Sequence, residues 1–555
     1  MRMLQDKPCR IKRSGAFYTT LRSIAAKRNS ARSAVARRSP HLYSGQVQSC
    51  LRYWRRPYGT DSRQQPYMAD SLEAEHKMQQ SKTLHTQILP ISPTKIGRFT
   101  VHDSSDLPLE DWHLELDETS PDAERIRTAA SRLKNSDIPV AFPTETVYGL
   151  GADATRSAAV RGIYAAKQRP SDNPLIVHIA SISQLRRLIL PSTPQLSSSA
   201  SSLGRSSDLS DASKDPIPEI YKPLIRRFWP GPLTIILPVA NDSPLATEVT
   251  AGLRTFGARM PRNLLALSLI KLADRPIAAP SANASTKPSP TAAEHVLYDL
   301  DGRIELIVDG GPCDVGVEST VVDGLSSPPL ILRPGGVSLG QLRQCSGWED
   351  TDIGYEDQSR KDGSKPRAPG MKYRHYSPKA QVVLFESGVA TPSLPDIMTY
   401  VGERRRIGIV RTKRWQKIGR EDPAASMQVQ ANGHTEGAMT DAHPVSPSVS
   451  HVMSKLPATS PIHAMLEESF SRSRVVAERH IISPSDGDGT ADIEVWDVQL
   501  GPTVRDVARG LFATLRDLDR ENVDCIMVEG VDDIEGDVAA AVMNRLRKAA
   551  EVRIE

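Results

Sequence analysis

The pattern of apolar and polar residues changes at about residue 118, where short apolar runs begin to alternate with amphipathic stretches. Ser120-Pro121 and the following DAERIRTAASRLKN (122–135) predict a capped helix with proline in its first turn. IPVAFP (138–143) predicts a short buried strand, and SAAVRGIYAAK (157–167) predicts a second helix. This alternation of strands and helices indicates an α/β fold.

The alternation continues to about residue 343. Apolar or β-branched runs bounded by Gly and Pro predict further strands. These runs are LIVHI (175–179), LTIILP (233–238), PIAAP (276–280), ELIVDG (305–310), STVVDG (319–324) and LILRPG (330–335). Helices are expected between some of them, over 263–274 and 291–300. We therefore expect a twisted open α/β domain over 118–343.

A second α/β segment begins near Ala380. Strands are expected over 381–386, 405–411 and 523–530, and the spacing predicts helices over 504–519 and 538–550. Strands that alternate with helices favour a parallel sheet. This segment is expected to form a smaller, Rossmann-like α/β domain over 380–555.

The remaining segments are polar or lack periodicity. We expect no packed core in them, because they carry few apolar anchors. They are a basic targeting segment (1–67), a poorly structured leader (68–117), a Ser-rich insertion (191–216), a linker (344–379) and a Pro/Ser-rich insertion (about 415–460).

Charge is spread unevenly along the chain. The net charge is +4, but residues 1–60 hold 14 Lys and Arg and one acid, Asp6, so the remainder is mildly acidic. A segment rich in Arg, Ser and Ala and nearly free of acids is typical of a mitochondrial transit peptide. A disordered basic arm that binds RNA is the alternative. Met68 begins a different composition and would serve as a second start, so we expect a cytoplasmic form and a mitochondrial form.

Five scattered cysteines, without CxxC spacing, argue against a disulfide framework and a structural zinc site. The sequence contains no apolar run of about 18 residues, so no membrane span is expected. GLGADA (149–154) matches a dinucleotide-binding pattern, with Asp172 about 20 residues further on. TETVY separates its first glycine from the strand, so a nicotinamide site is not expected there.

The stretch KQRPSDNPLIVHI (167–179) fits two interpretations. Lys167 and Arg169 would suit a helix end, with His178 a core histidine in a strand. They would equally suit an anion site. Other strand ends carry hydroxyl groups and cations that exceed what helix capping needs, and loops at strand ends bind ligands in α/β sheets. A polyanion together with a small polar substrate would fit this residue set.

Seven motifs resemble, in order, those of the YrdC-like threonylcarbamoyl-AMP synthases, in the long form with an extra C-terminal domain. They are FPTETVYGLGADA, KQRPSDNPLIVHI, FWPGPLTIIL, PSANAS, GVESTVVD, ILRPGG and APGMKYRHYSP. The resemblance covers 118–379 and continues through LFATLRDLD and MNRLRKAA. Two features depart from the family pattern. Thr286 stands where the family usually has Gly, and the insertion at 191–216 is atypical.

The resemblance implies a nucleotidyltransferase that joins L-threonine, bicarbonate and ATP, with Mg²⁺ on the phosphates. The product serves the threonylcarbamoyladenosine modification of tRNA through a downstream tRNA threonylcarbamoyl transferase. Lys167 and Arg169 would be catalytic. The implied threonine site is Thr146, His178, Arg259, Ala279 and Ser319. The implied ATP site is Arg169, Asn173, Thr255, Ser281, Asn283, Ser289, Arg333, Tyr373 and His375.

KYRHYSP (372–378) would act as a lid over the nucleotide, and Glu145 and Glu318 are candidate Mg²⁺ ligands. Two other functions stay open. One is a non-catalytic protein on the same fold that binds double-stranded RNA or tRNA. The other is carbamoyl transfer like that of a related hydrogenase-maturation domain, although the acylphosphatase and zinc-finger segments of that protein have no counterpart here.

Overall fold

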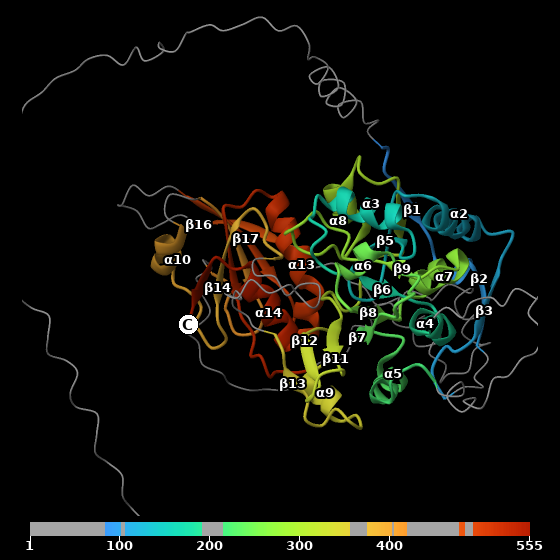
Figure 1. The fold of residues 1–555 in the computed structure, drawn as a ribbon. Helices are drawn as coiled ribbons and strands as arrows, with labels where there is room; N and C mark the ends of the chain where they lie inside the picture. The colour runs from blue at the N-terminus through green and yellow to red at the C-terminus, as the bar shows by residue number, and fades with distance from the viewer. Residues whose placement is uncertain are drawn as a thin grey trace, which may run out of the picture. The chain divides into compact units, whose positions relative to one another are not determined.

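The computed structural model describes residues 84–101, 106–190, 215–355, 375–401, 405–418, 477–482 and 492–555 (Figure 1). The expectations for residues 1–67, for Tyr373 and for most of both insertions lie outside these residues. Within them, no helix is long and apolar enough to cross a membrane.

An eleven-stranded mixed sheet forms the first part of the described chain. From edge to edge its strands are β1 (Gln87–Pro90), β10 (Leu306–Asp309), β4 (Val140–Phe142), β5 (Gly149–Asp153), β9 (Ile277–Ala278), β6 (Ile176–His178), β8 (Thr255–Arg259), β7 (Leu233–Pro238), β11 (Thr320–Asp323), β12 (Leu330–Arg333) and β13 (Asp352–Ile353). β6 is parallel to β8, and β7 is parallel to β11, whereas β9 runs antiparallel to both β5 and β6. The expected α/β architecture is confirmed.

Four helices of this part follow predicted amphipathic stretches, and four others were not predicted. Ser120 caps α2 by accepting from the Asp122 N–H, as the Ser-Pro pair predicts. Asn263 caps α7 in the same way by accepting from the Ala266 N–H. The helices are α2 (Pro121–Asn135), α3 (Ser157–Lys167), α4 (Ile182–Ile189), α5 (Lys222–Phe228), α6 (Thr247–Thr250), α7 (Leu264–Ala273), α8 (Ala293–Leu300) and α9 (Leu339–Arg343), with short 3₁₀ turns at Pro93–Lys95 and Glu219–Tyr221.

A second sheet of six strands forms the C-terminal part. Its order is β16 (Glu478–Ile482), β17 (Ile493–Gln499), β15 (Arg406–Arg411), β18 (Cys525–Glu529), β14 (Gln381–Phe385) and β19 (Val552–Ile554). All neighbouring pairs are parallel except β16 with β17, so the predicted parallel sheet gains one antiparallel edge strand. Its helices are α10 (Leu394–Val401), α13 (Val504–Arg520) and α14 (Ala539–Ala549).

The expectation of a poorly structured leader over 68–117 misses three strands. β1 extends the edge of the large sheet by pairing with β10. β2 (Gly97–Val101) pairs with β3 (Trp112–Leu116) in a separate ribbon, and Trp112 is buried. β1 pairs with a strand more than 200 residues further on, so local periodicity gave no signal for it. WHLEL in β3 does alternate apolar and polar residues, a strand signal that the prediction overlooked.

GLGADA does not form a nucleotide-binding turn. Its residues Gly149 to Asp153 make up strand β5, which pairs with β4 and β9. A dinucleotide fingerprint needs its glycines in a tight turn between strand and helix. The strand conformation agrees with the sequence-based argument that these glycines do not form such a turn.

Thr286 provides a test of backbone strain. Its φ is 74°, in the left-handed region that a β-branched residue rarely adopts. The side chain is exposed, and its hydroxyl donates to the neighbouring Ser285 carbonyl. We expect Thr286→Gly to raise the free energy of unfolding by about 1 kcal/mol, because glycine adopts this φ without a Cβ clash.

Thr286→Ala is the matched control, since it removes the branch but keeps the Cβ. Chemical denaturation of the three chains measures the difference. A glycine variant no more stable than the alanine variant would show that the loop stores no strain at this position.

Candidate active site

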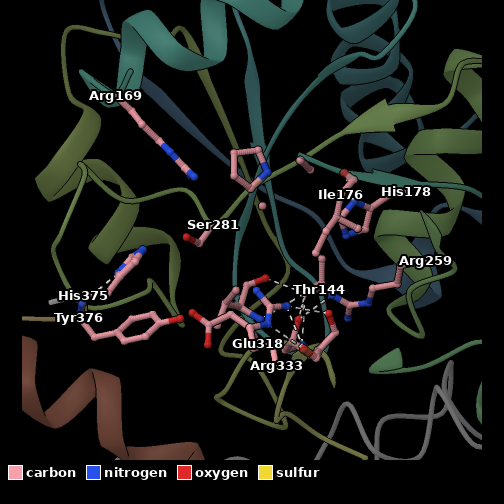
Figure 2. A pocket seen from close by; sticks show the side chains of 16 residues that line it. Thr144, Arg169, Ile176, His178, Arg259, Ser281, Glu318, Arg333, His375 and Tyr376 are labelled. Carbon is pink, nitrogen blue, oxygen red and sulfur yellow. Dashed lines mark hydrogen bonds between the residues drawn. The ribbon is translucent and has the colours of Figure 1, made fainter. Parts of the chain in front are cut away.

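A buried pocket lies where strand ends and loops of the large sheet converge (Figure 2). Its water-accessible volume is about 50 Å³. The lining residues are Thr144, Thr146, Val147, Gly149, Arg169, Ile176, His178, Arg259, Ala279, Pro280, Ser281, Glu318, Ser319, Arg333, His375 and Tyr376. Nine of the residues predicted for the threonine and ATP sites are among them. The pocket thus unites segments that are up to about 230 residues apart in sequence.

Arg259, at the end of β8, anchors one wall of the pocket. Its guanidinium donates to the Thr146 hydroxyl at 2.9 Å and forms an ion pair with Glu145 at 2.7 Å. The Thr146 hydroxyl is also 2.8 Å from that of Thr144. All four side chains are buried, so this wall is a fixed network of one cation, one carboxylate and two hydroxyl groups.

Arg333, at the end of β12, holds another part of the lining. It donates to the Ser319 carbonyl at 2.8 Å and to the Ser319 hydroxyl at 3.0 Å. Burial lowers the pKa of Arg333 to about 10, which leaves it charged at neutral pH. Gly335 permits this packing, because a Cβ there would lie 2.2 Å from the Thr320 nitrogen.

His178 is buried at the end of β6 and lines the pocket. Its Nδ1 lies 3.3 Å from the Ile176 carbonyl, and its ring meets the edge of Phe142. Burial, and next the charge of Arg259, lowers the pKa of His178 to about 3, so its ring is neutral. His178 is therefore both a strand residue of the core and a polar group that faces the pocket.

Arg169 and Lys167 take different positions at the end of α3. Figure 2 shows Arg169 pointing into the pocket on the side of Ser281. Among the described residues its guanidinium has no hydrogen-bond partner. Lys167 lies behind the pocket wall, where its ammonium donates to the carbonyls of Ser281 at 2.5 Å and Asn283 at 2.6 Å. Burial, followed by the charge of Arg169, lowers the pKa of Lys167 well below its usual value.

Other predicted residues are not part of the pocket lining. Ser289 donates to Glu318, and Asn283 accepts from Ser281 at 2.5 Å. Asn173 is buried, and its Oδ1 has no hydrogen-bond partner within the described ranges. Thr255 begins β8, at the opposite end of the strand from Arg259, and is not part of the lining.

Two comparisons with protein families agree with this geometry. Residues 133–335 match the family described as "Telomere recombination", which unites Sua5, YciO and YrdC. Residues 337–551 match the family described as the C-terminal domain of threonylcarbamoyl-AMP synthase. A threonylcarbamoyl-AMP synthase of Schizosaccharomyces pombe is 42% identical over 78% of this chain and 89% of its own length.

The chain belongs to the threonylcarbamoyl-AMP synthase family. A synthase of Pyrococcus abyssi is 38% identical over 78% of this chain and 95% of its own length. The crystal structure of P. abyssi Sua5 complexed with L-threonine superposes with a TM-score of 0.54. It is 32% identical and covers 85% of this chain and all of that chain. The family resemblance and the two-sheet architecture are confirmed.

The sequence analysis of this synthase family member assigned no contact to Tyr376. It also did not identify the side chains that bind Glu318. Tyr376 is buried, with its ring on Phe512 at 5.2 Å, and Figure 2 shows it directed at Glu318. Burial, and then the negative charge of Glu318, raises the pKa of Tyr376 to about 12. The cluster of aromatic residues in KYRHYSP was the sequence signal from which a role of Tyr376 in the pocket could have been predicted.

The candidate Mg²⁺ ligands do not fit a metal held by the protein. Both oxygens of Glu318 are used, one by Ser289 and one by Arg545, and Glu145 is paired with Arg259. Over the described parts of the chain, no three His, Cys, Asp or Glu side chains are placed to hold a metal ion. Glu145 Oε2 is buried without a hydrogen-bond partner in the described structure, but one such oxygen does not make a Mg²⁺ site held by the protein.

The neutral state of His178 predicts a pH effect on stability. An unfolded histidine titrates near 6.5, so below that pH the unfolded chain binds a proton that native His178 resists. The stabilisation is complete above the unfolded pKa and is lost as pH falls toward about 3. Between pH 7 and pH 5, the free energy of unfolding should fall by about 2 kcal/mol more in this chain than in His178→Asn.

Denaturant titrations of both chains at the two pH values measure this difference. The contributions of all other histidines to the pH dependence are the same in both chains and cancel. If the two chains lose stability in parallel, His178 is not held neutral by the fold.

Proposed function

We propose that this chain joins L-threonine, bicarbonate and ATP into threonylcarbamoyl-AMP and pyrophosphate, for the threonylcarbamoyladenosine modification of tRNA. The observation that carries the proposal is the convergence of Arg169, Arg259 and Arg333 on one buried pocket. Three guanidinium groups beside hydroxyl groups suit a carboxylate and a polyphosphate in one site. Membership of the synthase family supports the same reaction.

The threonine would lie against the wall of Thr146 and Arg259, with His178, Ala279 and Ser319 around it. The Arg259 guanidinium, which is held by Glu145 and Thr146, would present its positive charge to the amino-acid carboxylate. The neutral ring of His178 offers an uncharged polar contact for the amine or hydroxyl. The similar P. abyssi protein was crystallised in complex with L-threonine, which supports L-threonine as a ligand of this chain.

The nucleotide would lie on the side of Arg169, Ser281, Arg333 and His375. The unpartnered Asn173 oxygen suits a contact with the same ligand. Asn283 and Ser289 would position this wall, and Lys167 would either hold the Ser281–Asn283 loop or turn toward the phosphates. The present volume of about 50 Å³ has room for one or two waters, so ATP requires His375 and Tyr376 to move out of the pocket.

The chemistry needs no enzyme nucleophile. The threonine amine adds to bicarbonate and releases water, and the resulting carbamate oxygen attacks the α-phosphorus of ATP as pyrophosphate leaves. Proximity, exclusion of water and fixed positive charge would supply the rate enhancement. Mg²⁺ would arrive with the ATP phosphates, since the protein carboxylates are already paired.

The product would pass to a tRNA threonylcarbamoyl transferase. The alternative of a non-catalytic protein that binds double-stranded RNA or tRNA predicts no chemistry in the pocket. Pyrophosphate release that depends on threonine separates the two functions. Its absence in a folded chain that still binds RNA would favour the binding protein.

Arg169→Ala and Lys167→Ala are each expected to lower threonine-dependent pyrophosphate release by ~10²-fold, because removing one fixed group that stabilises developing charge has this effect. Arg187→Ala is the matched control, since Arg187 is an exposed cation on α4 outside the pocket. A coupled pyrophosphate assay and thermal unfolding measure the outcome. If both variants keep nearly full activity, or if both unfold, Lys167 and Arg169 serve only to end the helix.

We also propose that the basic segment 1–67 directs a mitochondrial form, on the basis of its composition. A fluorescent protein fused to residues 1–67 should enter mitochondria, and a chain begun at Met68 should remain in the cytosol. Replacing the arginines of the first fusion by glutamine is the control and should abolish import. Cytosolic fluorescence of the unaltered fusion would remove the targeting proposal.

A further inference from the structure

Two buried arginines of the C-terminal part reach the walls of the pocket in the first part. Arg545 lies on α14 and is fully buried, with 0% of its side chain exposed. Arg516 lies on α13, and 5% of its side chain is exposed. A buried guanidinium is costly unless it is paired, so its partner reveals what it holds in place.

Arg545 holds the Glu318 carboxylate. Its Nε donates to Glu318 Oε2 at 3.0 Å, and its Nη1 donates to the Pro334 carbonyl at 2.5 Å. The other carboxylate oxygen accepts from Ser289 at 2.6 Å. Glu318 directly precedes Ser319 and lines the pocket, so Arg545 fixes this wall from behind.

Arg516 holds the other wall through Asp299. Its Nη2 donates to Asp299 Oδ2 at 2.7 Å and also to the Pro288 carbonyl. The same Asp299 oxygen accepts from the Ala284 N–H at 3.2 Å, directly after the Ser281–Asn283 loop that Lys167 binds. Asp299 Oδ1 also pairs with Lys287 at 3.0 Å, so Arg516 is the cation of this carboxylate that comes from the C-terminal part.

The backbones around these pairs are packed too closely to shift independently. A Cβ at Gly316, whose φ is 77°, would lie 2.4 Å from the Ala508 carbonyl of α13. Val147 and Val317 pack in the same apolar core as Phe512. The first part and α13 therefore share one core beside the pocket.

We propose that Arg545 and Arg516 are positioning residues of the synthase, through which the C-terminal part sets the geometry of the Glu318 wall and of the Ser281–Asn283 loop. This inference rests on the proposed function. It goes further by assigning the pocket to both parts of the chain. Arg545 keeps the Glu318 carboxyl ionised, so that this carboxylate can accept the hydrogen bond from Ser289.

The ionisation of Glu318 provides a readout that a purely structural role would not move. Burial alone would raise the pKa of Glu318, but the charges of Arg545 and Arg333 outweigh it and lower the pKa to about 2. The titratable and charged groups that face this carboxyl are Arg545, Arg333, Tyr376 and His375. Without Arg545 the pKa must rise, so the carboxyl would take up a proton at a higher pH.

The experiment compares Arg545→Met with Arg547→Met. Arg547 lies on the same helix and is also paired, but its partners are Glu386 and Asp533, both in the C-terminal part. We expect Arg545→Met to lower turnover at pH 7 by tenfold or more and to move the acid limb of kcat/KM to higher pH. Arg545→Lys should restore part of the turnover and move the acid limb part of the way back to its original pH. Arg547→Met should keep the acid limb of the unaltered chain.

Two further measurements keep the inference testable if Arg545→Met folds poorly or activity is absent. Glu318→Gln combined with Arg545→Met should be no less active than Glu318→Gln alone, because the charge that Arg545 serves is gone. Difference infrared spectra against Glu318→Gln follow the carboxylate without turnover. An unchanged Glu318 titration in Arg545→Met, or an equal shift in Arg547→Met, would overturn the role of Arg545. A chain whose Glu318 behaves as expected but releases no pyrophosphate would overturn the proposed function instead.

Arg516→Met should raise the KM for ATP by fivefold or more and change the KM for threonine little, because its wall lies on the nucleotide side. Arg520→Met is the control, since Arg520 also reaches the first part, at the Glu294 carbonyl, but does not contact the loop. Equal changes in both KM values, or an equal effect of Arg520→Met, would overturn the role of Arg516.

Discussion

Burial of positive charge is the constraint on which the site depends. Arg259 and Arg333 lie in a pocket with little room for water, and each is held by groups that compensate it, Glu145 for one and Ser319 for the other. Arg169 differs, because its guanidinium points into the pocket without a hydrogen-bond partner in the described chain. Of the three arginines in the lining, Arg169 is thus the one that is left for a polyanion to meet.

The same constraint explains why a second α/β part is joined to the first. Glu318 and Asp299 are carboxylates that the first part buries, and their principal cations, Arg545 and Arg516, come from α14 and α13. Neither pair could form across a loosely tethered interface, since a hydrogen bond weakens steeply as its geometry is lost. The close approach of Gly316 to α13 supplies the required precision.

Elements with a local signal were predictable from the sequence. SAAVRGIYAAK forms a helix over the predicted residues, and LTIILP forms a strand over the predicted residues, because amphipathic spacing and flanking prolines act over a few residues. β1 was missed because its partner β10 lies more than 200 residues further on. The motifs identified most of the pocket lining, but Arg545 carries no signal of its own until the fold places it beside Glu318.

Tyr376 connects these observations to substrate entry. Its backbone has a φ of 67°, which a non-glycine residue adopts at a cost, and its ring is held by Phe512 and by the guanidinium of Arg545 at 5.7 Å. The contacts that keep this ring in the pocket therefore come from the same helices that fix the walls. If ATP enters where the Tyr376 ring now lies, as proposed above, the C-terminal part both shapes the site and opposes its opening. Such entry would break the contacts of the Tyr376 ring with Phe512 and Arg545.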